Sequence, residues 1–286
     1  MNAIDLDTTT YLQRLGIAQR PAATLDALRD LQLRHTGAIA FETLSTMLRA
    51  QVPIDLASLQ RKILQGGRGG YCYELNLLFL ALLRELGFDA RGLTGRVVMG
   101  GSEDALTPRT HMLVLVTLEG RRYITDVGFG GMVPTAPLLL DSEDAQATPH
   151  EPYRLVHHLV EHRDGRYTLR AQVAGAWRAL YVFDLVPPAP VDYEVGNWYV
   201  STHPDSPFVG QLVAARTGEG WRKTLRNGDF AVHRIGVGTE RRRLADVDSV
   251  IAVLRDEFGL QVPQHPQLRA TIEHLLAGDD VGDPAA

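Results

Sequence analysis

The chain has 286 residues, of which 45% are hydrophobic and 22% charged, and its formal net charge at pH 7 is -5. These values are typical of a globular protein. They exclude a disordered chain, which would be poorer in apolar residues, and a strongly basic arm that binds nucleic acid. The length predicts two or three domains.

The only cysteine is Cys72, which excludes an intramolecular disulfide and any cysteine-based zinc or iron–sulfur site. The N-terminal segment lacks the apolar core of a secretory signal. The longest apolar run, 75–83, is far shorter than the roughly 18 residues of a membrane-spanning helix. We therefore expect a cytoplasmic protein with no nucleic-acid or membrane partner.

Helices are predicted over residues 1–90, where apolar residues recur at helical spacing between capping signals. The four predicted helices cover 11–15, preceded by the threonines 8–10, then 25–34, 56–65 and 72–86. Gly87 ends the fourth helix as a left-handed C-terminal cap. Cys72 begins the same helix, on its apolar face.

A thiolate at the start of a helix is stabilised by free backbone N–H groups and by the helix dipole. The position of Cys72 therefore predicts a lowered pKa and a reactive thiol. The alternative is a small core residue, since unpaired cysteines are among the most buried side chains. The sequence around the cysteine leaves both interpretations open.

From Ala90 the pattern changes to short β-rich runs separated by turns. Their spacing predicts an antiparallel barrel or a strongly curled sheet. The prolines in 187–190 predict a linker, and further strands and a helix over 247–258 follow it. The predicted strands are 91–99, 110–118, 122–126, 153–161, 167–173 and 178–185, then 209–215, 221–225, 230–235 and 242–244.

A predicted hairpin places a histidine beside an aspartate. Glu119 and Gly120 form a credible two-residue loop. If Leu118 pairs with Arg121, His111 and Asp126 point to the same face as diagonal neighbours, with Cβ atoms roughly 7–8 Å apart or less. His111 could then act as a base oriented by the carboxylate of Asp126, and Cys72 could supply the nucleophile of a catalytic triad. Alternatively, His111 bonds to backbone and Asp126 caps a turn.

The run from Arg68 to Asn76, RGGYCYELN, resembles the R-G-G-x-C-x-E-x-N signature of the arylamine N-acetyltransferases. The resemblance continues in 35–44, at Thr110 and His111, in 126–130 and in 197–208. It covers most of the chain in the family's order. It implies an α+β fold with a helical domain over 1–90, an antiparallel β-barrel over 91–186, a linker over 187–209 and an α/β lid over 210–286, with a papain-like Cys-His-Asp site.

The resemblance implies a ping-pong reaction in which Cys72 takes an acetyl group from acetyl-CoA and passes it to an arylamine, hydrazine or arylhydroxylamine. Acetyl-CoA is then a co-substrate, and no permanent cofactor or metal is expected. The implied acceptor-binding residues are Phe41, Tyr73, Phe129 and Phe208; those near CoA are Thr110, Gly128, Gly130 and Gly131; and Glu42 with Arg68 forms a buried ion pair that supports the site.

The chain departs from the family pattern at Ala40 and Thr43, where proline and asparagine are usual, and this leaves acceptor preference open. It lacks the long insertion of vertebrate members, so it resembles the prokaryotic type. An amide synthase of the same family, which closes a macrolactam, is one alternative. A cysteine hydrolase and a non-catalytic binding domain are two others. The oligomeric state stays open, a homo-oligomer included.

Overall fold

The computed structural model describes residues 5–160 and 163–278. Its first part is helical, as predicted. Side chains of Asp7, Thr24 and Asp55 cap three of the helices by accepting backbone N–H groups. The elements are α1 (Thr8–Arg14), α2 (Leu25–Ala38), α3 (Leu44–Met47), α4 (Leu56–Leu59), the π-helical turn η1 (Gln60–Gln65) and α5 (Cys72–Glu85).

Helix α2 extends four residues beyond its predicted end at Arg34. The polar pair His35 and Thr36 and the following Gly37 end the apolar pattern in the sequence. Both polar side chains are nevertheless buried, and His35 shares a hydrogen bond of 2.8 Å with the hydroxyl of Tyr11. Tertiary packing therefore continues a helix that local propensity would end.

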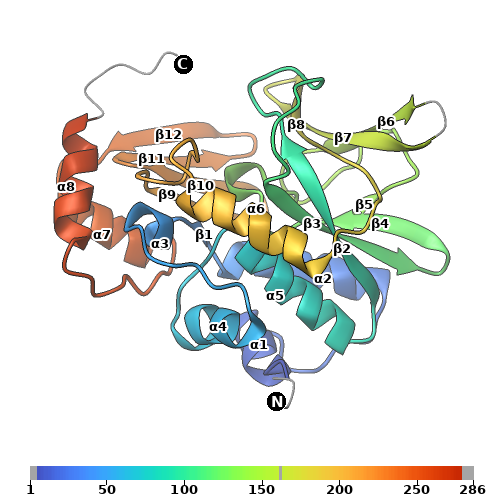
Figure 1. The fold of residues 1–286 in the computed structure, drawn as a ribbon, viewed down its shortest axis with the longest axis horizontal. Coiled ribbons are helices and arrows are strands. Elements are labelled where there is room, and N and C mark those ends of the chain that lie inside the picture. The colour runs from blue at the N-terminus through green and yellow to red at the C-terminus, as the bar shows by residue number, and fades with distance from the viewer. Residues whose placement is uncertain (1–4, 161–162, 279–286) are drawn as a thin grey trace.

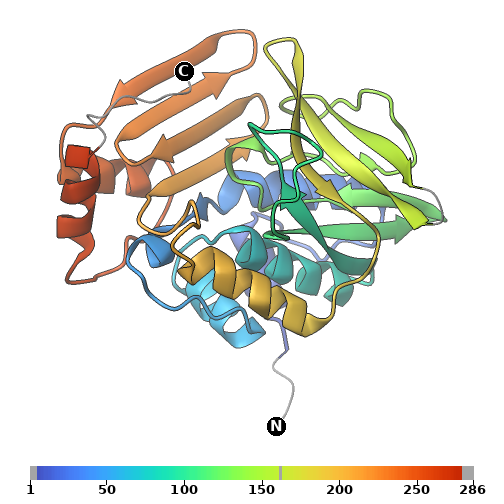
Figure 2. The same ribbon diagram turned by 45° about the horizontal axis from the view of Figure 1, so that its top comes forward.

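The second part is a seven-stranded antiparallel sheet in the order β5-β4-β3-β2-β8-β7-β6, which curls on itself (Figures 1 and 2). Gln146 joins its two ends, because its side chain bonds to the backbone of Leu139 and its backbone pairs with Tyr153. The predicted curled barrel is confirmed. Its strands are β2 (Asp89–Val97), β3 (His111–Leu118), β4 (Arg121–Thr125), β5 (Leu138–Leu139), β6 (Tyr153–Val160), β7 (Arg163–Val173) and β8 (Ala176–Phe183).

The hairpin of β3 and β4 has the predicted register, with Leu118 opposite Arg121 and Val114 opposite Thr125. Its two loop residues, Glu119 and Gly120, have φ angles of 51° and 75°. Positive φ at both positions is what a two-residue hairpin loop that follows the strand twist requires. The register thus carries His111 and Asp126 to one face.

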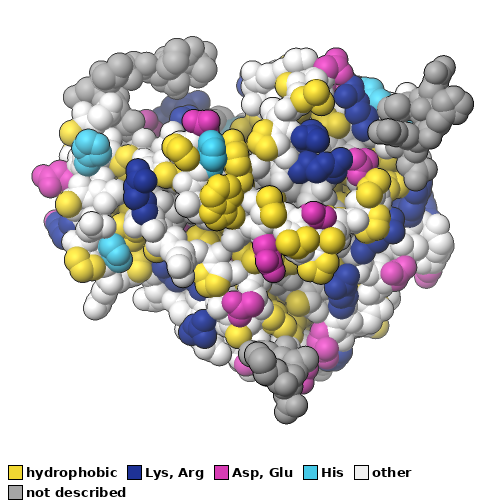
Figure 3. Space-filling view, viewed as in Figure 1, with side chains coloured by type: hydrophobic (Ala, Val, Ile, Leu, Met, Phe, Trp, Pro, Cys, Tyr) yellow, Lys and Arg dark blue, Asp and Glu magenta, His cyan; other side chains and the backbone are white. Residues whose placement is uncertain are grey.

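The segment 187–209, predicted to be a linker, instead contains helix α6 (Pro190–Thr202). Proline is favoured at the first turn of a helix, where its missing N–H costs nothing, so Pro190 begins this helix. Figure 1 shows α6 crossing the front of the molecule beside α5. Its outer face exposes hydrophobic side chains, and apolar groups lie among charged ones on that side of the molecule (Figure 3). The exposed ones on α6 are Val191, Val195 and Trp198.

The third part is a five-stranded sheet in the order β1-β9-β10-β11-β12. Strand β1 (Phe41–Glu42) comes from the helical region and pairs with β9, with Phe41 opposite Ala215. The segments 1–90 and 210–286 therefore share one sheet, and the expected domain limits stay predictions. The other elements are β9 (Val213–Gly218), β10 (Trp221–Arg226), β11 (Asp229–Arg234), β12 (Gly238–Arg243), α7 (Val247–Asp256) and α8 (Leu268–Gly278). Neither β1 nor α8 was predicted.

Helix α5 lies at the centre of the largest hydrophobic core, where it packs against β2, β3 and the other N-terminal helices. Separate cores fill the barrel and the space between the third sheet and helices α7 and α8. Within residues 5–160 and 163–278, no helix has the length and apolar character needed to cross a membrane.

Candidate active site

The nucleophile candidate, Cys72, is the first residue of α5, and 3% of its surface is exposed. The chain before it must pass close to its neighbours. A side chain at Gly69 would collide with the carbonyl of Ala40, and one at Gly70 would lie 2.8 Å from Cβ of Glu74. The two glycines therefore let the backbone pass between these neighbours to the start of α5. Cys72 then lies where α5 meets the barrel.

The predicted histidine–aspartate pair is present. Nε2 of His111 lies 2.7 Å from Oδ2 of Asp126, and both side chains are buried. Burial alone would raise the pKa of Asp126, but the charge of His111 and hydrogen bonds from its neighbours outweigh it and lower that pKa. The carboxylate stays ionised and accepts the Nε2 proton. Nδ1 is then the ring nitrogen left to exchange a proton with a thiol.

Two further residues hold the carboxylate of Asp126, and sequence analysis gave neither of them a role. Asn76, one turn after Cys72, donates from Nδ2 to Oδ1 of Asp126 at 2.9 Å. The hydroxyl of Tyr181, on β8, donates to Oδ2 at 3.0 Å. The signals for Asn76 are its place at the end of the RGGYCYELN run and its position as a lone amide on an apolar helix face. Tyr181 had no signal, because only the curled sheet brings β8 to this point.

Contacts of the backbone bring Cys72 and the hairpin together. The thiol of Cys72 donates to the carbonyl of Thr110 at 3.5 Å, next to His111 in the chain. A Cβ at Gly128 would lie 2.8 Å from Cα of Cys72 and 2.7 Å from Nδ2 of Asn76. Only glycine fits this place, so the segment after Asp126 lies directly against the start of α5. The predicted nucleophile, base and orienting carboxylate are thus assembled at one place.

The expectation of a lowered pKa for Cys72 is wrong for this structure. Burial raises its pKa to about 12, which outweighs the backbone N–H groups of Met112 and Tyr73, and the charge of Asp126 acts in the same direction as burial. A thiolate in an apolar site loses more hydration than the helix terminus returns. Burial therefore favours the thiol over the thiolate at this position, and a neighbouring base favours proton removal.

Three of the four predicted acceptor-binding rings lie around this centre. Phe129 packs edge-on against the ring of His111 at 4.9 Å between centroids. Phe41 and Phe208 contact each other at 5.6 Å, and Phe208 also contacts Tyr71. A Cβ at Gly130 would lie 3.7 Å from the Phe41 ring, so the 128–130 segment passes beside that pair.

Tyr73, the fourth predicted ring, is fully buried. Its hydroxyl donates to the carbonyl of Arg109 at 3.1 Å, and its ring packs against Tyr71 and Tyr193. Gly196 of α6 lies so close to this hydroxyl that a Cβ there would overlap it. The structure therefore gives Tyr73 a packing role beneath α6, and its contact with an acceptor stays a prediction.

The residues predicted near CoA have clear packing roles of their own. Gly128 lies against Cys72, and Gly130 begins the 3-10 turn η2 (Gly130–Met132) with a φ of 59°. A Cβ at Gly131 would lie 2.9 Å from Thr224 of β10. Thr110 is half-buried and offers its carbonyl to the thiol. Their contacts with CoA stay predictions.

The predicted ion pair between Glu42 and Arg68 is present, with Nη2 and Oε1 2.7 Å apart. Lys62 was not predicted to take part in this pair, but its ammonium lies 2.7 Å from Glu74 and 3.9 Å from Glu42. Burial would raise the pKa of Glu42, but the charges of Lys62 and Arg68 lower it. Glu74 also accepts the backbone N–H of Tyr71 at 3.2 Å. This network holds the start of α5 in place.

A family model described as N-acetyltransferase matches residues 24–267. The arylamine N-acetyltransferase of Mycobacterium tuberculosis is 42% identical over 281 residues, which cover 95% of this chain and 96% of that protein. The chain belongs to the arylamine N-acetyltransferase family. The similarity extends to the three-dimensional fold. The structure of the Mycobacterium marinum arylamine N-acetyltransferase in complex with CoA has a TM-score of 0.86 and 43% identity, over 94% of this chain and 99% of that one.

The chain is also similar to a protein with a different name. The proansamycin X synthase of Amycolatopsis mediterranei is 35% identical over 282 residues, which cover 98% of this chain and 99% of that protein. The family's fold agrees with the α+β fold described above. Because two relatives with different names are both similar to this chain, the identity of the acceptor depends on the residues of the site.

Proposed function

We propose that this protein transfers an acetyl group from acetyl-CoA to arylamines, hydrazines or arylhydroxylamines through an acetyl-cysteine. The observation that carries the proposal is the arrangement of Cys72 at a helix start beside the His111–Asp126 pair. A buried thiol with a histidine base and an orienting carboxylate is the machinery of nucleophilic acyl transfer. The CoA complex of the M. marinum relative supports the donor.

In the first half-reaction, Nδ1 of His111 takes the thiol proton as Cys72 attacks the carbonyl carbon of the thioester. The new C–S bond forms a tetrahedral intermediate, and the bond to the sulfur of CoA then breaks. The imidazolium returns its proton to the departing sulfur, so free CoA leaves and acetyl-Cys72 remains. Asp126 holds the Nε2 proton throughout and stabilises the charged ring.

In the second half-reaction, the nitrogen of the acceptor attacks the acetyl carbon of acetyl-Cys72. His111 takes a proton from that nitrogen, the C–S bond breaks, and the sulfur of Cys72 recovers the proton. The products are the N-acetyl compound and the resting thiol. Cys72 is 3% exposed, and an acyl transferase, unlike a hydrolase, must keep water from the acyl-cysteine.

An aromatic acceptor is supported by the rings around the centre. Phe129 contacts the catalytic imidazole, and Phe41 packs against Phe208 beside the same segment. Aromatic rings pack edge-on or offset against one another, which adds to the burial of apolar area. The single thiol must also stay reduced for this chemistry, which supports a reducing compartment such as the cytoplasm.

Intact-mass analysis after acetyl-CoA is added without acceptor tests the proposal. We expect one acetyl group per chain, on the peptide that contains Cys72, and none on Cys72→Ser. Addition of an arylamine should then remove the group and produce one equivalent of amide. If the acetyl group is lost at the same rate without an amine, the protein is a hydrolase and the proposal is wrong.

The similarity to proansamycin X synthase favours a second candidate, an amide synthase that closes a ring from a thioester-bound chain. Such an enzyme would use the same triad but take its acyl group from a long substrate that carries its own amine. Equal amounts of acetyl-CoA and an aryl-amine-containing thioester should distinguish the two. Acetyl-Cys72 is expected from the first function, and a cyclised product without acetylation from the second.

A further inference from the structure

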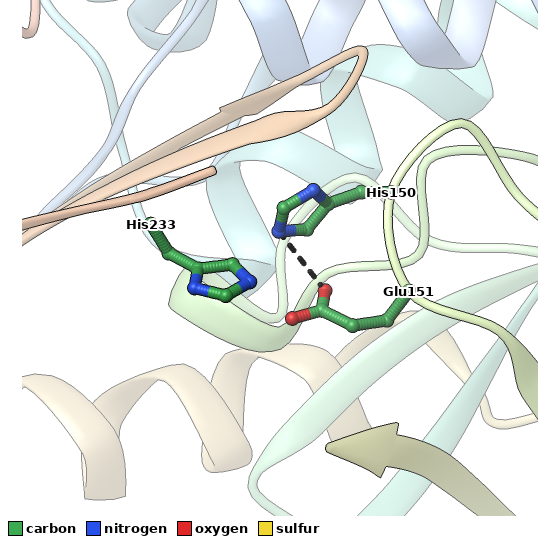
Figure 4. A group of neighbouring side chains, drawn as sticks. All are labelled: His150, Glu151 and His233. Atoms are coloured by element: carbon green, nitrogen blue, oxygen red, sulfur yellow. Dashed lines mark ion pairs between the residues drawn. The ribbon is translucent and has the colours of Figure 1, made fainter. Parts of the chain in front are cut away.

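A second group of side chains with ligand chemistry lies away from the catalytic centre, where the barrel meets the third sheet. His150 and Glu151 are in the loop before β6, and His233 is on β11. One ligand atom of each lies within 4.8 Å of the others. Figure 4 shows the two imidazole rings and the carboxylate converging on the same space.

Two of these side chains are buried with atoms that have no hydrogen-bond partner. His150 is 4% exposed and Glu151 is 7% exposed. Among the described residues, Nδ1 of His150 makes no hydrogen bond, while Nε2 of His150 and Oε2 of Glu151 have only each other, as an ion pair at 3.2 Å. Buried polar groups are almost always satisfied, so such a group calls for a ligand or a bound ion. Nε2 of His150 and Oε2 of Glu151 point toward each other inside the cluster (Figure 4).

The remaining atoms of the cluster are held by neighbours in the way that metal ligands are held. Nδ1 of His233 shares a hydrogen bond of 2.9 Å with the hydroxyl of Thr239, so Nε2 is the nitrogen left for the cluster. Oε1 of Glu151 pairs with Arg222, so Oε2 is left in the same way. Hydrogen bonds to the outer atoms of histidine and carboxylate ligands fix their orientation in metal sites.

We propose that His150, Glu151 and His233 bind a divalent transition-metal ion of the Zn²⁺ type. Two imidazole nitrogens and one carboxylate oxygen form a ligand set that zinc uses, with a fourth position open. Nε2 of His150 and Oε2 of Glu151 lie 3.2 Å apart. Donors around tetrahedral zinc, with bonds of about 2.0–2.2 Å, are separated by about 3.3 Å. The pair is therefore already at the spacing that the ion requires.

The charges around the cluster indicate a site of moderate strength. A histidine ligand offers its lone pair from the neutral ring, so the ion would bind His150 in its uncharged form. The Arg222 guanidinium opposes a cation, while the carboxylate of Glu151 favours one. We expect binding by these three residues to be reversible by a chelator.

A bound ion would fasten the loop of the barrel to the third sheet. A backbone hydrogen bond from Gly220 to the carbonyl of Pro149 already joins these two parts at 2.8 Å. Arg222, which pairs with Glu151, also contacts the sulfur of Met132 in η2 at 3.5 Å. The ion would thus stabilise the arrangement of the sheet beside the segment that carries Phe129. This role does not depend on the proposed acyl transfer.

Calorimetric titration with Zn²⁺ alone, with thermal unfolding as a second readout, tests the site. The full chain is compared with Cys72→Ser, because the catalytic thiol could itself bind zinc. We expect one equivalent bound in both proteins and a rise in the unfolding midpoint of several degrees. His233→Gln and Glu151→Gln should each weaken binding by at least about 10-fold.

The matched control is His265→Gln, a half-buried histidine outside the cluster that accepts a hydrogen bond from the backbone of Gln267. It should bind zinc as the parent chain does. His233 is itself half-buried, so its variant is expected to fold even where a change at His150 would not. The proposal is overturned if millimolar Zn²⁺ causes no heat and no stabilisation, if His233→Gln binds equally well, or if binding disappears in Cys72→Ser alone.

Discussion

The amide of Asn76 donates to the carboxylate of Asp126 at 2.9 Å. The same amide nitrogen donates to the carbonyl of Met112 at 2.7 Å, and the Asn76 oxygen accepts the backbone N–H of Val127 at 3.1 Å. One side chain on the helix of Cys72 therefore binds both the strand that carries His111 and the segment that follows Asp126. The relative positions of Cys72 and the histidine–aspartate pair depend on it.

Removal of the Asn76 side chain should loosen this junction. We expect Asn76→Ala to lower the free energy of unfolding by about 2–4 kcal/mol, because several buried polar groups lose their partner. The rate of Cys72 acetylation should fall as well. Urea unfolding and intact-mass kinetics measure the two effects. Gln65→Ala, on the surface at the end of η1, is the control and should change neither.

Replacement of Asp126 by asparagine should reduce acyl transfer by about 10⁴-fold, close to the complete loss expected for Cys72→Ser. An amide cannot accept the Nε2 proton as a carboxylate does, so His111 loses its favoured tautomer and the stabilisation of its charged form. Single-turnover acetylation measures the effect. Asp141→Asn, which alters a surface ion pair with Arg122, is the control. Equal rates for Asp126→Asn and the parent would exclude a role for the pair.

Substitution of Gly128 by alanine should damage both stability and activity. The new Cβ would lie 2.8 Å from Cα of Cys72, a backbone atom that cannot move away without shifting α5. We expect a loss of about 1–3 kcal/mol and a lower rate of acetylation. Gly101→Ala is the matched control, since its Cβ would lie 3.6 Å from the nearest atom, the carbonyl of Val98, and its φ is not positive. If Gly128→Ala behaves like this control, the close contact is not rigid.

Acid should destabilise the fold through the buried His35. Burial, with a smaller contribution from Arg14, lowers its pKa from 6.5 to about 3. Between those values the unfolded chain binds a proton that the folded chain does not. Stability therefore falls as pH drops from 6.5 towards 3, by about 1.4 kcal/mol per pH unit from this residue.

The measurement is urea unfolding at several pH values between 7 and 4. His35→Gln should flatten the slope by that amount whatever its effect at pH 7. His150 contributes in the same direction, so some slope should remain. His265→Gln, outside the buried core, is the control. An unchanged slope in His35→Gln would mean that this histidine is protonated in the folded protein at acidic pH.

Much of the candidate site was predictable, because its signals are short in range. Gly87 and the apolar spacing after Cys72 define a helix from neighbouring residues. The loop residues Glu119 and Gly120 determine the register of one hairpin, and the period of two along each strand then places His111 and Asp126 on one face. Each step depends on residues fewer than about twenty positions apart in the chain.

Other features required contacts between distant parts of the chain. Strand β1 has two residues and is a strand only because β9, far along the chain, pairs with it. Helix α6 was hidden because prolines favour both linkers and helix starts. Tyr181 reaches Asp126 only after the sheet has curled. No local pattern in the sequence contains this information.

The sequence by itself determined the type of chemistry, a single thiol at a helix start with a histidine and an aspartate on one hairpin face. Tertiary structure decided the electrostatics and the partners. Burial raises the pKa of Cys72 to about 12, although its position at the start of the helix predicted a lowered pKa. Folding also brought His150 and Glu151 to His233. Burial and long-range proximity set both results, because hydration and Coulomb energies depend on distance in space and not along the chain.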